Sequence, residues 1–431
     1  MQASIESIGP FGRRLSFALP SEQIMSQYSA RLSEIARSVR IKGFRPGKIP
    51  PKVIEQRYGQ QAQRETVSAV LQETFETVLR DHALRLAGHP EIQCDNPSDF
   101  RFTATFEVMP EFSAIDVTAL SITRPIASVE ESDIDQMIEH LRLQRRQWQA
   151  VTRGAQLGDR VTIESWSDVE GTRFPPEGIE RSVVVLGSHA LFAPIEEGLR
   201  DVKVNEEKVL CVKFPKDWRV AELADKDVTL NSLVKEVAQP LLPAIDTAFI
   251  ESFGIPGGEV ATFRKEIRAN LERELNTALM NRLRQAVADQ LVAAYGQTDL
   301  PPQLVQREAR LAWEQQQESI HAQNAKVSEP TKEEIEPFLE PARKRILIGM
   351  LLAEIARRNA IRLDQQRVLS ALQAIASTYE DPDQVISAYS ADTDKMTGLQ
   401  TRVMEEQVIE WIADHAQQTT QQLSFREALG R

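Results

Sequence analysis

Gly43-Phe44-Arg45-Pro46-Gly47-Lys48-Ile49-Pro50 is the stretch of this 431-residue chain from which the fold and function are best worked out. The two glycines permit backbone angles that are closed to other residues, and the two prolines prevent a helix from continuing. The stretch therefore predicts a loop that carries the ring of Phe44 between cations. An apolar ring at a loop tip is useful where a partner covers it. The alternative is an ordinary basic turn whose phenylalanine folds back into the core.

The charge around this loop is opposite to the charge of the chain. Six basic residues and no acidic residue lie between positions 35 and 54, in a chain whose formal net charge is −12. A positive island on an acidic protein indicates a docking point for a polyanionic partner. The six basic residues are Arg37, Arg40, Lys42, Arg45, Lys48 and Lys52.

The octapeptide resembles, position by position, the GFRxGKxP ribosome-docking signature of the trigger factor family, bacterial chaperones that meet nascent chains at the exit tunnel. The resemblance continues along nearly the whole chain, in residues 1–5, 12–14, 247–254 and 405–408. The resemblance implies that the loop binds the ribosome. The residues that match the signature are Gly43, Phe44, Arg45, Pro46, Gly47 and Lys48.

Length and composition favour a soluble protein of two to four domains, with 26% charged residues and a pI near 5.3. The apolar runs are too short to span a bilayer, and the first 25 residues lack the apolar segment of a secretory signal. Cys94 and Cys211 are interpreted as incidental thiols in a reducing cytoplasm. The six histidines are scattered without a metal-binding motif, so we expect no metal and no cofactor.

Hydrophobic periodicity and the resemblance together divide the chain into four segments. We expect a multidomain α+β protein with an N-terminal α+β ribosome-binding domain, an inserted β-rich domain and an all-α C-terminal chaperone domain with long arms. The segments are 1–112 for ribosome binding, 113–150 for a linker and a helix that joins the C-terminal domain, 151–238 for the inserted domain and 239–431 for the helical domain.

In the N-terminal segment, Leu15, Phe17 and Leu19 alternate as in a strand with one buried face, and so do residues 100–108. Ser21 is expected to cap a helix that ends near Val39, at the loop. A short helix over 51–58 and a separate, longer helix over about 67–79 are expected to follow.

Further along, a helix is expected to carry Ile134 to Trp148 on one face, after an extended connection over 111–124. Strands are predicted at 161–163, 182–186, 208–214 and 228–237, and a proline linker at 239–243. Six helices are then predicted over 259–295, 302–327, 335–359, 364–379, 382–390 and 393–417. Pro337 fits a first helical turn, whereas Pro341 would kink its helix unless that helix starts later.

The resemblance implies that the inserted domain is a prolyl isomerase of the FK506-binding-protein (FKBP) type. Such an enzyme needs no nucleophile, because the barrier of roughly 18–20 kcal/mol comes from amide resonance. An apolar, aromatic-walled pocket lowers this barrier by desolvating the bond and favouring the twisted amide. Carried over from the family, the pocket residues are Phe174, Ile195, Trp218 and Leu230.

Several of these pocket positions depart from the family pattern. The family motif Ile-Pro-Gly-Phe-Glu-x-Gly becomes Phe192-Ala193-Pro194-Ile195-Glu196-Glu197-Gly198, so Ile195 stands where the family has a pocket phenylalanine. Leu230 replaces a second phenylalanine, and Trp218 replaces a tyrosine. Each lost ring removes part of the wall. We therefore expect an isomerase of reduced rate; the alternative is a domain that serves as a spacer or a binding platform.

The sequence is thus expected to encode a cytoplasmic, ribosome-associated chaperone that holds nascent chains open and assists their folding or export. Apolar stripes of the C-terminal helices are expected to be mostly core, and the resemblance implies that two helical arms form the client cradle. The expected partners are the large ribosomal subunit and unfolded polypeptides, with a homodimer left open and no membrane or DNA.

Two alternative functions are compared with this one. The first is a free-standing prolyl isomerase whose helices only dimerise it. The second is an RNA-binding protein, which is not expected because the basic cluster covers only about twenty residues and has no stacking aromatic beyond Phe44.

Overall fold

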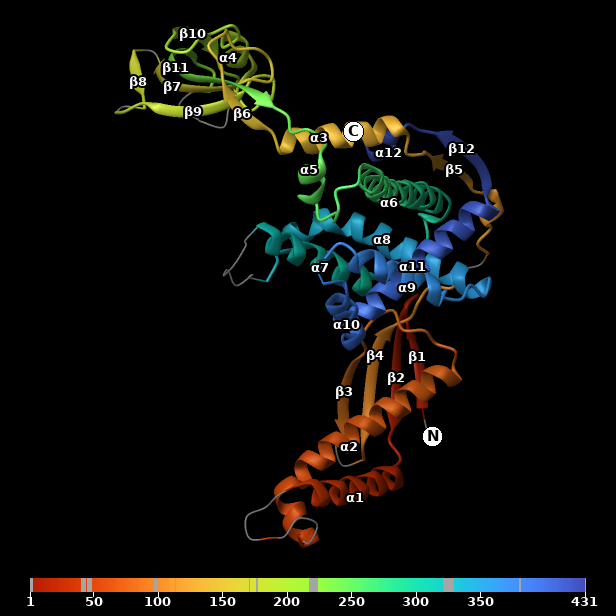
Figure 1. Ribbon diagram of the computed structural model, residues 1–431. Coiled ribbons are helices and arrows are strands. Elements are labelled where there is room, and N and C mark those ends of the chain that lie inside the picture. The colour runs from red at the N-terminus through yellow and green to blue at the C-terminus, as the bar shows by residue number, and fades with distance from the viewer. Residues whose placement is uncertain are drawn as a thin grey trace. The chain divides into compact units, whose positions relative to one another are not determined.

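The computed structural model describes residues 3–39, 44, 49–96, 99–112, 114–169, 171–175, 177–216, 224–320, 329–379 and 381–430. The chain divides into two units, one of Met1–Pro125 with Met280–Gln421 and one of Ile126–Leu279 with Gln422–Arg431. Its middle region is rich in strands and its C-terminal region is helical, as the sequence predicted (Figure 1).

The first unit begins with an antiparallel sheet in the order β1-β2-β4-β3. Its strands are β1 (Ala3–Ile8), β2 (Gly12–Ala18), β3 (Glu91–Asn96) and β4 (Arg101–Glu107). Alternate residues such as Phe17 and Phe106 are buried on one face, as the period-two pattern predicted. Helix α2 (Pro51–Asp81) covers that face and meets Phe106 edge-on through Phe75, with ring centroids 5.4 Å apart.

Helix α1 (Ser21–Ser38) pairs with the first half of α2 through a small core that includes Ile35, Ile54 and Ala62. The prediction of two separate helices in the α2 region was wrong, because α2 is continuous. Gly59, directly after the predicted end of the short helix, lies inside α2 and permits close helix packing: a Cβ atom there would lie 3.0 Å from the Tyr28 hydroxyl of α1. The cap of α1 also differs, since Pro20 occupies the N-cap position and makes no side-chain capping bond.

The helical part of the first unit contains the second half of α6 (Val260–Tyr295) and five further helices, with a core that includes Val287, Leu291, Leu351 and Ile412. Most of the predicted apolar stripes are therefore core, as expected. The helices are α7 (Pro302–Ile320), α8 (Lys332–Arg358), α9 (Gln365–Ala376), α10 (Pro382–Ala391) and α11 (Thr393–His415).

Helix α8 starts earlier than the sequence predicted. Thr331 caps it and exchanges hydrogen bonds with Glu334 in a capping box, so Pro337 and Pro341 both lie inside the helix. The connection before this bundle also contains a short 3-10 helix (Val117–Ala119), and the strand β5 (Ser121–Ile126) pairs with β12 (Gln417–Gln422).

The second unit has a helical cluster and a β-rich domain. The cluster packs α3 (Glu131–Gln144), α5 (Thr247–Glu251), α12 (Phe425–Leu429) and the first half of α6 around Ile134, Phe249 and Phe263. Trp148, expected on the α3 face, lies instead in strand β6 (Gln147–Ala150). The guanidinium groups of Arg146 and Arg160 lie 4.8 and 5.1 Å from its ring centroid.

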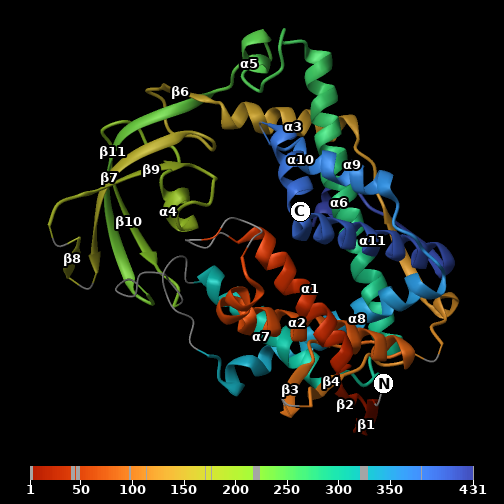
Figure 2. The same cartoon turned by 90° about the horizontal axis from the view of Figure 1, so that it is seen from below.

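The β-rich domain is a six-stranded antiparallel sheet with one short helix, α4 (Ala193–Gly198), beside β10 (Figure 2). Its main strand order is β10-β11-β7-β8, while β6 pairs with β11 and β9 pairs with β7. The strands after β6 are β7 (Arg160–Val169), β8 (Thr172–Phe174), β9 (Glu180–Val185), β10 (Glu207–Lys213) and β11 (Asp227–Leu241).

Strand β11 runs through the segment that was predicted to be a proline linker. Pro240 pairs with Trp148, and Val151 N–H bonds to Val237 O at 2.8 Å. The backbone N–H and C=O groups of successive residues in a strand point to opposite sides. Those of residues 237, 239 and 241 point toward β6, and those of Pro240 point away from it. The pairing of β11 with β7 ends at Ala238, so the missing N–H of Pro240 interrupts no ladder.

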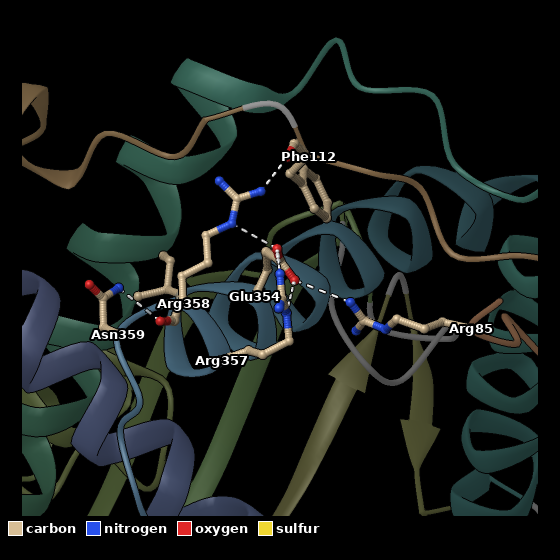
Figure 3. A network of polar contacts seen from close by, with 7 residues as sticks. Arg85, Phe112, Glu354, Arg357, Arg358 and Asn359 are labelled. Atoms are coloured by element: carbon tan, nitrogen blue, oxygen red, sulfur yellow. Dashed lines mark hydrogen bonds and ion pairs between the residues drawn. The ribbon is translucent and has the colours of Figure 1, made fainter. Parts of the chain in front are cut away.

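A buried carboxylate joins the segment between α2 and β3 to the helical part of the first unit (Figure 3). Glu354 of α8, with a side chain only 7% exposed, accepts hydrogen bonds from Arg85 at 3.1 Å and from Arg357 and Arg358 at 2.7 Å. Arg358 also donates to the carbonyl of Phe112. The hydrogen bond from Arg357 contributes most to lowering the pKa of Glu354, which falls from 4.5 to about 2 although burial opposes this change.

We predict that Glu354→Gln lowers the free energy of unfolding at pH 7 by at most about 3 kcal/mol, the value that a depression of this size corresponds to. The folded-state pKa lies below the unfolded one, so the ionised carboxylate stabilises the fold above about pH 4.5 and loses this effect as the pH falls toward 2. Urea unfolding followed from pH 7 to pH 3 should therefore show the wild type and the variant converging. Glu340→Gln, exposed on the same helix, is the control, and a constant difference across this range would contradict the prediction.

Candidate functional site

The first candidate site is the segment between α1 and α2, which contains the octapeptide. Helix α1 ends at Ser38 and α2 begins at Pro51, so the segment connects two packed helices. Ile35 and Ile49, on either side of it, are buried in the core that these helices share. The side chain of Phe44 is 40% exposed, which agrees with the interpretation that a partner covers this ring.

The other residues of the docking signature, Gly43, Arg45, Pro46, Gly47 and Lys48, lie outside the residues that the structure describes, as do Arg40 and Lys42. The two remaining basic residues of the island, Arg37 and Lys52, are described and exposed. Ribosome binding by these individual residues stays a prediction.

The second candidate site is an apolar cluster on the inner face of the β-rich domain. Phe174 of β8 pairs with Ser167 of β7, Ser167 pairs with Leu230 of β11, and Leu230 pairs with Leu210 of β10. Directly paired residues of antiparallel strands direct their side chains to the same face. Phe174, Leu230 and Leu210 therefore form one row across the sheet, and all three are only partly buried.

Ile195 of α4 packs into the same cluster and is 8% exposed. The helix can approach β10 closely because residue 198 is glycine: a Cβ atom there would lie 2.4 Å from Cδ2 of Leu210. The structure thus brings Phe174, Ile195 and Leu230 together. Trp218, the fourth predicted pocket residue, lies outside the described residues.

Sequence analysis missed an aromatic pair in this cluster. The rings of Phe192 and Phe214 stack with centroids 5.2 Å apart and planes tilted by 22°. Phe214 is buried, while Phe192 is partly exposed. The sequence did indicate an aromatic residue here, because Phe192 stands where the family motif has isoleucine. Three positions later, Ile195 stands where the motif has phenylalanine.

Glu196, the residue after Ile195, is 6% exposed and holds the loop before α4. Its carboxylate accepts the backbone N–H groups of Gly187 at 2.9 Å and Leu191 at 3.0 Å. Burial raises the pKa of Glu196, but hydrogen bonds from Leu191, Gly187 and His189 outweigh it, so the pKa lies below its ordinary value. A charged carboxylate with this many backbone donors fixes residues 187–191 against the helix.

The helical part of the first unit has an apolar groove of about 420 Å³. Helices α8 and α11 line it, together with Leu363 before α9, and Glu405, Gln400 and Thr401 supply its polar atoms. Among the residues of the predicted stripes, Leu311 of α7 is 45% exposed. The apolar lining residues are Gly349, Leu352, Ala353, Ala356, Leu363, Met404 and Val408.

The described residues contain no group of three or more His, Cys, Asp or Glu side chains that could hold a metal ion. None of the helices in the described part of the chain is long and apolar enough to cross a membrane. Cys94 and Cys211 are exposed free thiols.

Comparison with known proteins gives the family. The model described as "Bacterial trigger factor protein (TF)" matches residues 1–141, and the model of its C-terminus matches residues 259–414. Trigger factor of Xanthomonas euvesicatoria pv. vesicatoria (strain 85-10) is 52% identical over 429 residues, which cover 100% of both chains. This chain belongs to the trigger factor family. Trigger factor of Stenotrophomonas maltophilia (strain K279a) is 51% identical over the same length.

A solved structure described as "Promiscuous Substrate Recognition in Folding and Assembly Activities of the Trigger Factor Chaperone" aligns with 96% of this chain and 99% of its own. The identity is 18% and the TM-score is 0.40. Family membership confirms the interpretation of the chain as a ribosome-associated chaperone of a family that carries a prolyl isomerase domain. The alternative of a free-standing isomerase is not favoured.

Proposed function

We propose that this chain docks on the large ribosomal subunit through Phe44 and the cations around it, and holds emerging polypeptides on its helical part. In the same proposal, the domain at 151–238 isomerises prolyl bonds, residues 1–112 dock, 113–150 connect, 239–431 hold clients, and the protein works in the cytoplasm. The exposed ring of Phe44, between two packed helices on an acidic chain, is the observation that carries the proposal. A homodimer stays an open prediction.

Docking combines an apolar contact with a charge contact. Burying the ring of Phe44 against a partner contributes roughly 1.5–3 kcal/mol. The surrounding cations displace counterions from ribosomal RNA, and this part of the binding weakens as salt rises. The chain as a whole is acidic, so this positive island is favoured as the region that attracts RNA.

We predict that the triple variant Phe44→Ala, Arg45→Ala, Pro46→Ala loses co-sedimentation with ribosomes. Loss of the ring alone should weaken binding by about tenfold to a hundredfold, and loss of Arg45 should reduce the slope of log K against log salt by about one. Met25→Ala, which removes another exposed apolar side chain from the same domain, is the control. Pelleting of the triple variant at the wild-type level would refute the docking assignment.

Client holding is assigned to the helical part because its groove combines apolar walls with a few polar atoms. Unfolded segments differ in sequence, so a surface that holds them must adapt. Met404 provides a flexible and polarisable side chain for this purpose. The small area of the groove favours weak contacts and rapid release.

The middle domain can be removed cleanly, because β6 and the end of β11 pair with each other and Val151 bonds to Val237. Replacing residues 152–236 by Asn-Gly should close these two strands as a hairpin. We predict that this deletion variant still suppresses aggregation of an unfolded client at close to the wild-type level. Loss of most of the protection, in a variant that keeps its helical circular dichroism, would move the main client site into the middle domain.

Prolyl isomerisation is the proposed activity of the apolar cluster. Uncatalysed isomerisation takes tens of seconds, so even a weak catalyst gives a measurable rate. We predict that the full chain accelerates isomerisation of a short Ala-Leu-Pro-Phe peptide and that the deletion variant does not. If the full chain gives no acceleration, the domain is a binding platform and not an enzyme.

A further inference from the structure

We propose that Phe192, and not residue 195, supplies the aromatic wall on which a prolyl residue of the substrate packs, an inference that rests on the proposed isomerase function. Phe192 is thus a specificity-determining residue for apolar prolyl peptides. The replacement of phenylalanine by Ile195 is then compensated within the same turn of the chain, and the cluster keeps an aromatic wall.

The two positions are neighbours in space. Phe192 is the N-cap residue of α4, and its carbonyl accepts the Ile195 N–H at 2.8 Å. Residues three apart in a helical turn lie on the same side of it. Relative to the family motif, in which isoleucine precedes phenylalanine by three positions, this chain has the two side chains exchanged. The exchange conserves total side-chain volume, a change that packed clusters tolerate well.

Burial decides which of the two side chains can reach a substrate. Ile195 is 8% exposed and belongs to the core of the cluster, whereas Phe192 is partly buried and packs against that core. Three other side chains resemble Phe192 in being packed against the core but only partly buried: Phe174, Leu210 and Leu230. The partly accessible members of the cluster are this row, Phe192 and the aliphatic residues Val151, Leu191 and Val204, so that Phe174 and Phe192 supply its partly accessible phenylalanine rings.

The ring of Phe192 is held in a fixed orientation. It stacks on the buried Phe214, so one side of the ring rests on the core. The backbone before it is fixed by Glu196, which bonds to the N–H groups of Gly187 and Leu191. A wall that is already in place costs little to organise when the peptide binds. Glu196 is in this sense a positioning residue that acts through Phe192.

An aromatic face suits this role chemically. Its surface is apolar and removes water from the prolyl bond, which favours the twisted amide over the planar, solvated one. The ring is also flat and large, so it covers one face of a prolyl ring. A branched aliphatic side chain at position 192 would cover less of that face.

The experiment compares Phe192→Ile, Ile195→Phe and the double exchange Phe192→Ile with Ile195→Phe, all in the full-length chain. We expect Phe192→Ile to lower kcat/KM for the Ala-Leu-Pro-Phe peptide by about tenfold, because the smaller side chain buries less of the prolyl ring. The double exchange should restore most of the loss, because isoleucine at position 192 covers less of position 195, where the family motif has its ring. Ile195→Phe alone adds volume to the core and should lower the melting temperature without raising kcat/KM.

Val209→Ala is the matched control. Val209 is 60% exposed on β10, and because it precedes Leu210 its side chain points to the opposite face of the sheet. Its kcat/KM should equal that of the wild type. Glu196→Gln, compared with the exposed Glu197→Gln, should speed amide exchange at Gly187 and Leu191 and raise KM more than it lowers kcat.

Binding of the same peptide, measured by calorimetry, separates this proposal from the isomerase proposal. If the wild type catalyses and Phe192→Ile retains full kcat/KM, Phe192 is not the wall and the isomerase assignment stands. If the wild type is inactive but binds the peptide, and Phe192→Ile weakens that binding about tenfold, the enzyme assignment fails and the role of Phe192 stands. If Phe192→Ile, folded by circular dichroism, changes neither catalysis nor binding, this inference is refuted.

Discussion

The burial of Glu354 is the constraint on which the first unit depends. A carboxylate that is 7% exposed is tolerated only because three arginines bind it, and one of them, Arg85, comes from the N-terminal domain, 269 residues away in sequence. Separating that domain from α8 would remove one of the three partners and leave the two arginines of α8 itself. Glu354 is on the same helix as Leu352 and Ala356, which line the apolar groove, although its side chain points to another side of that helix. The N-terminal domain carries the proposed docking loop, and α8 lines the proposed client groove. The ion pair between Arg85 and Glu354 links the two.

The middle domain is connected to the rest of the chain through paired strands and not through a buried ion pair. The chain enters it through β6 and leaves it through the end of β11, and these two strands pair with each other. The stacking of Arg146 and Arg160 on Trp148 covers the joint. Since the chain enters and leaves the domain on adjacent strands, residues of the apolar cluster can be replaced without disturbing the helical cluster of the second unit. This independence is consistent with the loss of pocket aromatics in a chain that retains 52% identity to a relative over its whole length.

Patterns that depend on near neighbours were predictable from the sequence, and contacts between distant residues were not. Alternation identified the strands around Phe17 and Phe106, and spacing identified the long C-terminal helices such as α6 and α8. The prediction divided α2 after residue 58, and the reason for a glycine at 59, the close approach of Tyr28, lies on another helix. Pro240 suggested a linker because proline usually interrupts a strand. Only the structure shows that the backbone of Pro240 faces the side of β11 where pairing with β7 has already ended. For the sites, the family motif located Ile195, but the stacking of Phe192 on Phe214 spans two elements and needed the structure.

Considered together, the departures from the family pattern change the aromatic lining of the cluster less than each departure suggests alone. Taken singly, Ile195 and Leu230 each remove a ring from the pocket. In the structure Ile195 is core, and the tight contact of Gly198 with Leu210 leaves α4 little room to move away from β10. A ring placed at 195 beside the existing ring at 192 would overpack this site, at a cost of about 1–3 kcal/mol. Because interiors are close-packed, one aromatic position in this turn excludes the other. On the proposed assignment of Phe192, the cluster is a repacked pocket and not one that has lost its aromatic wall.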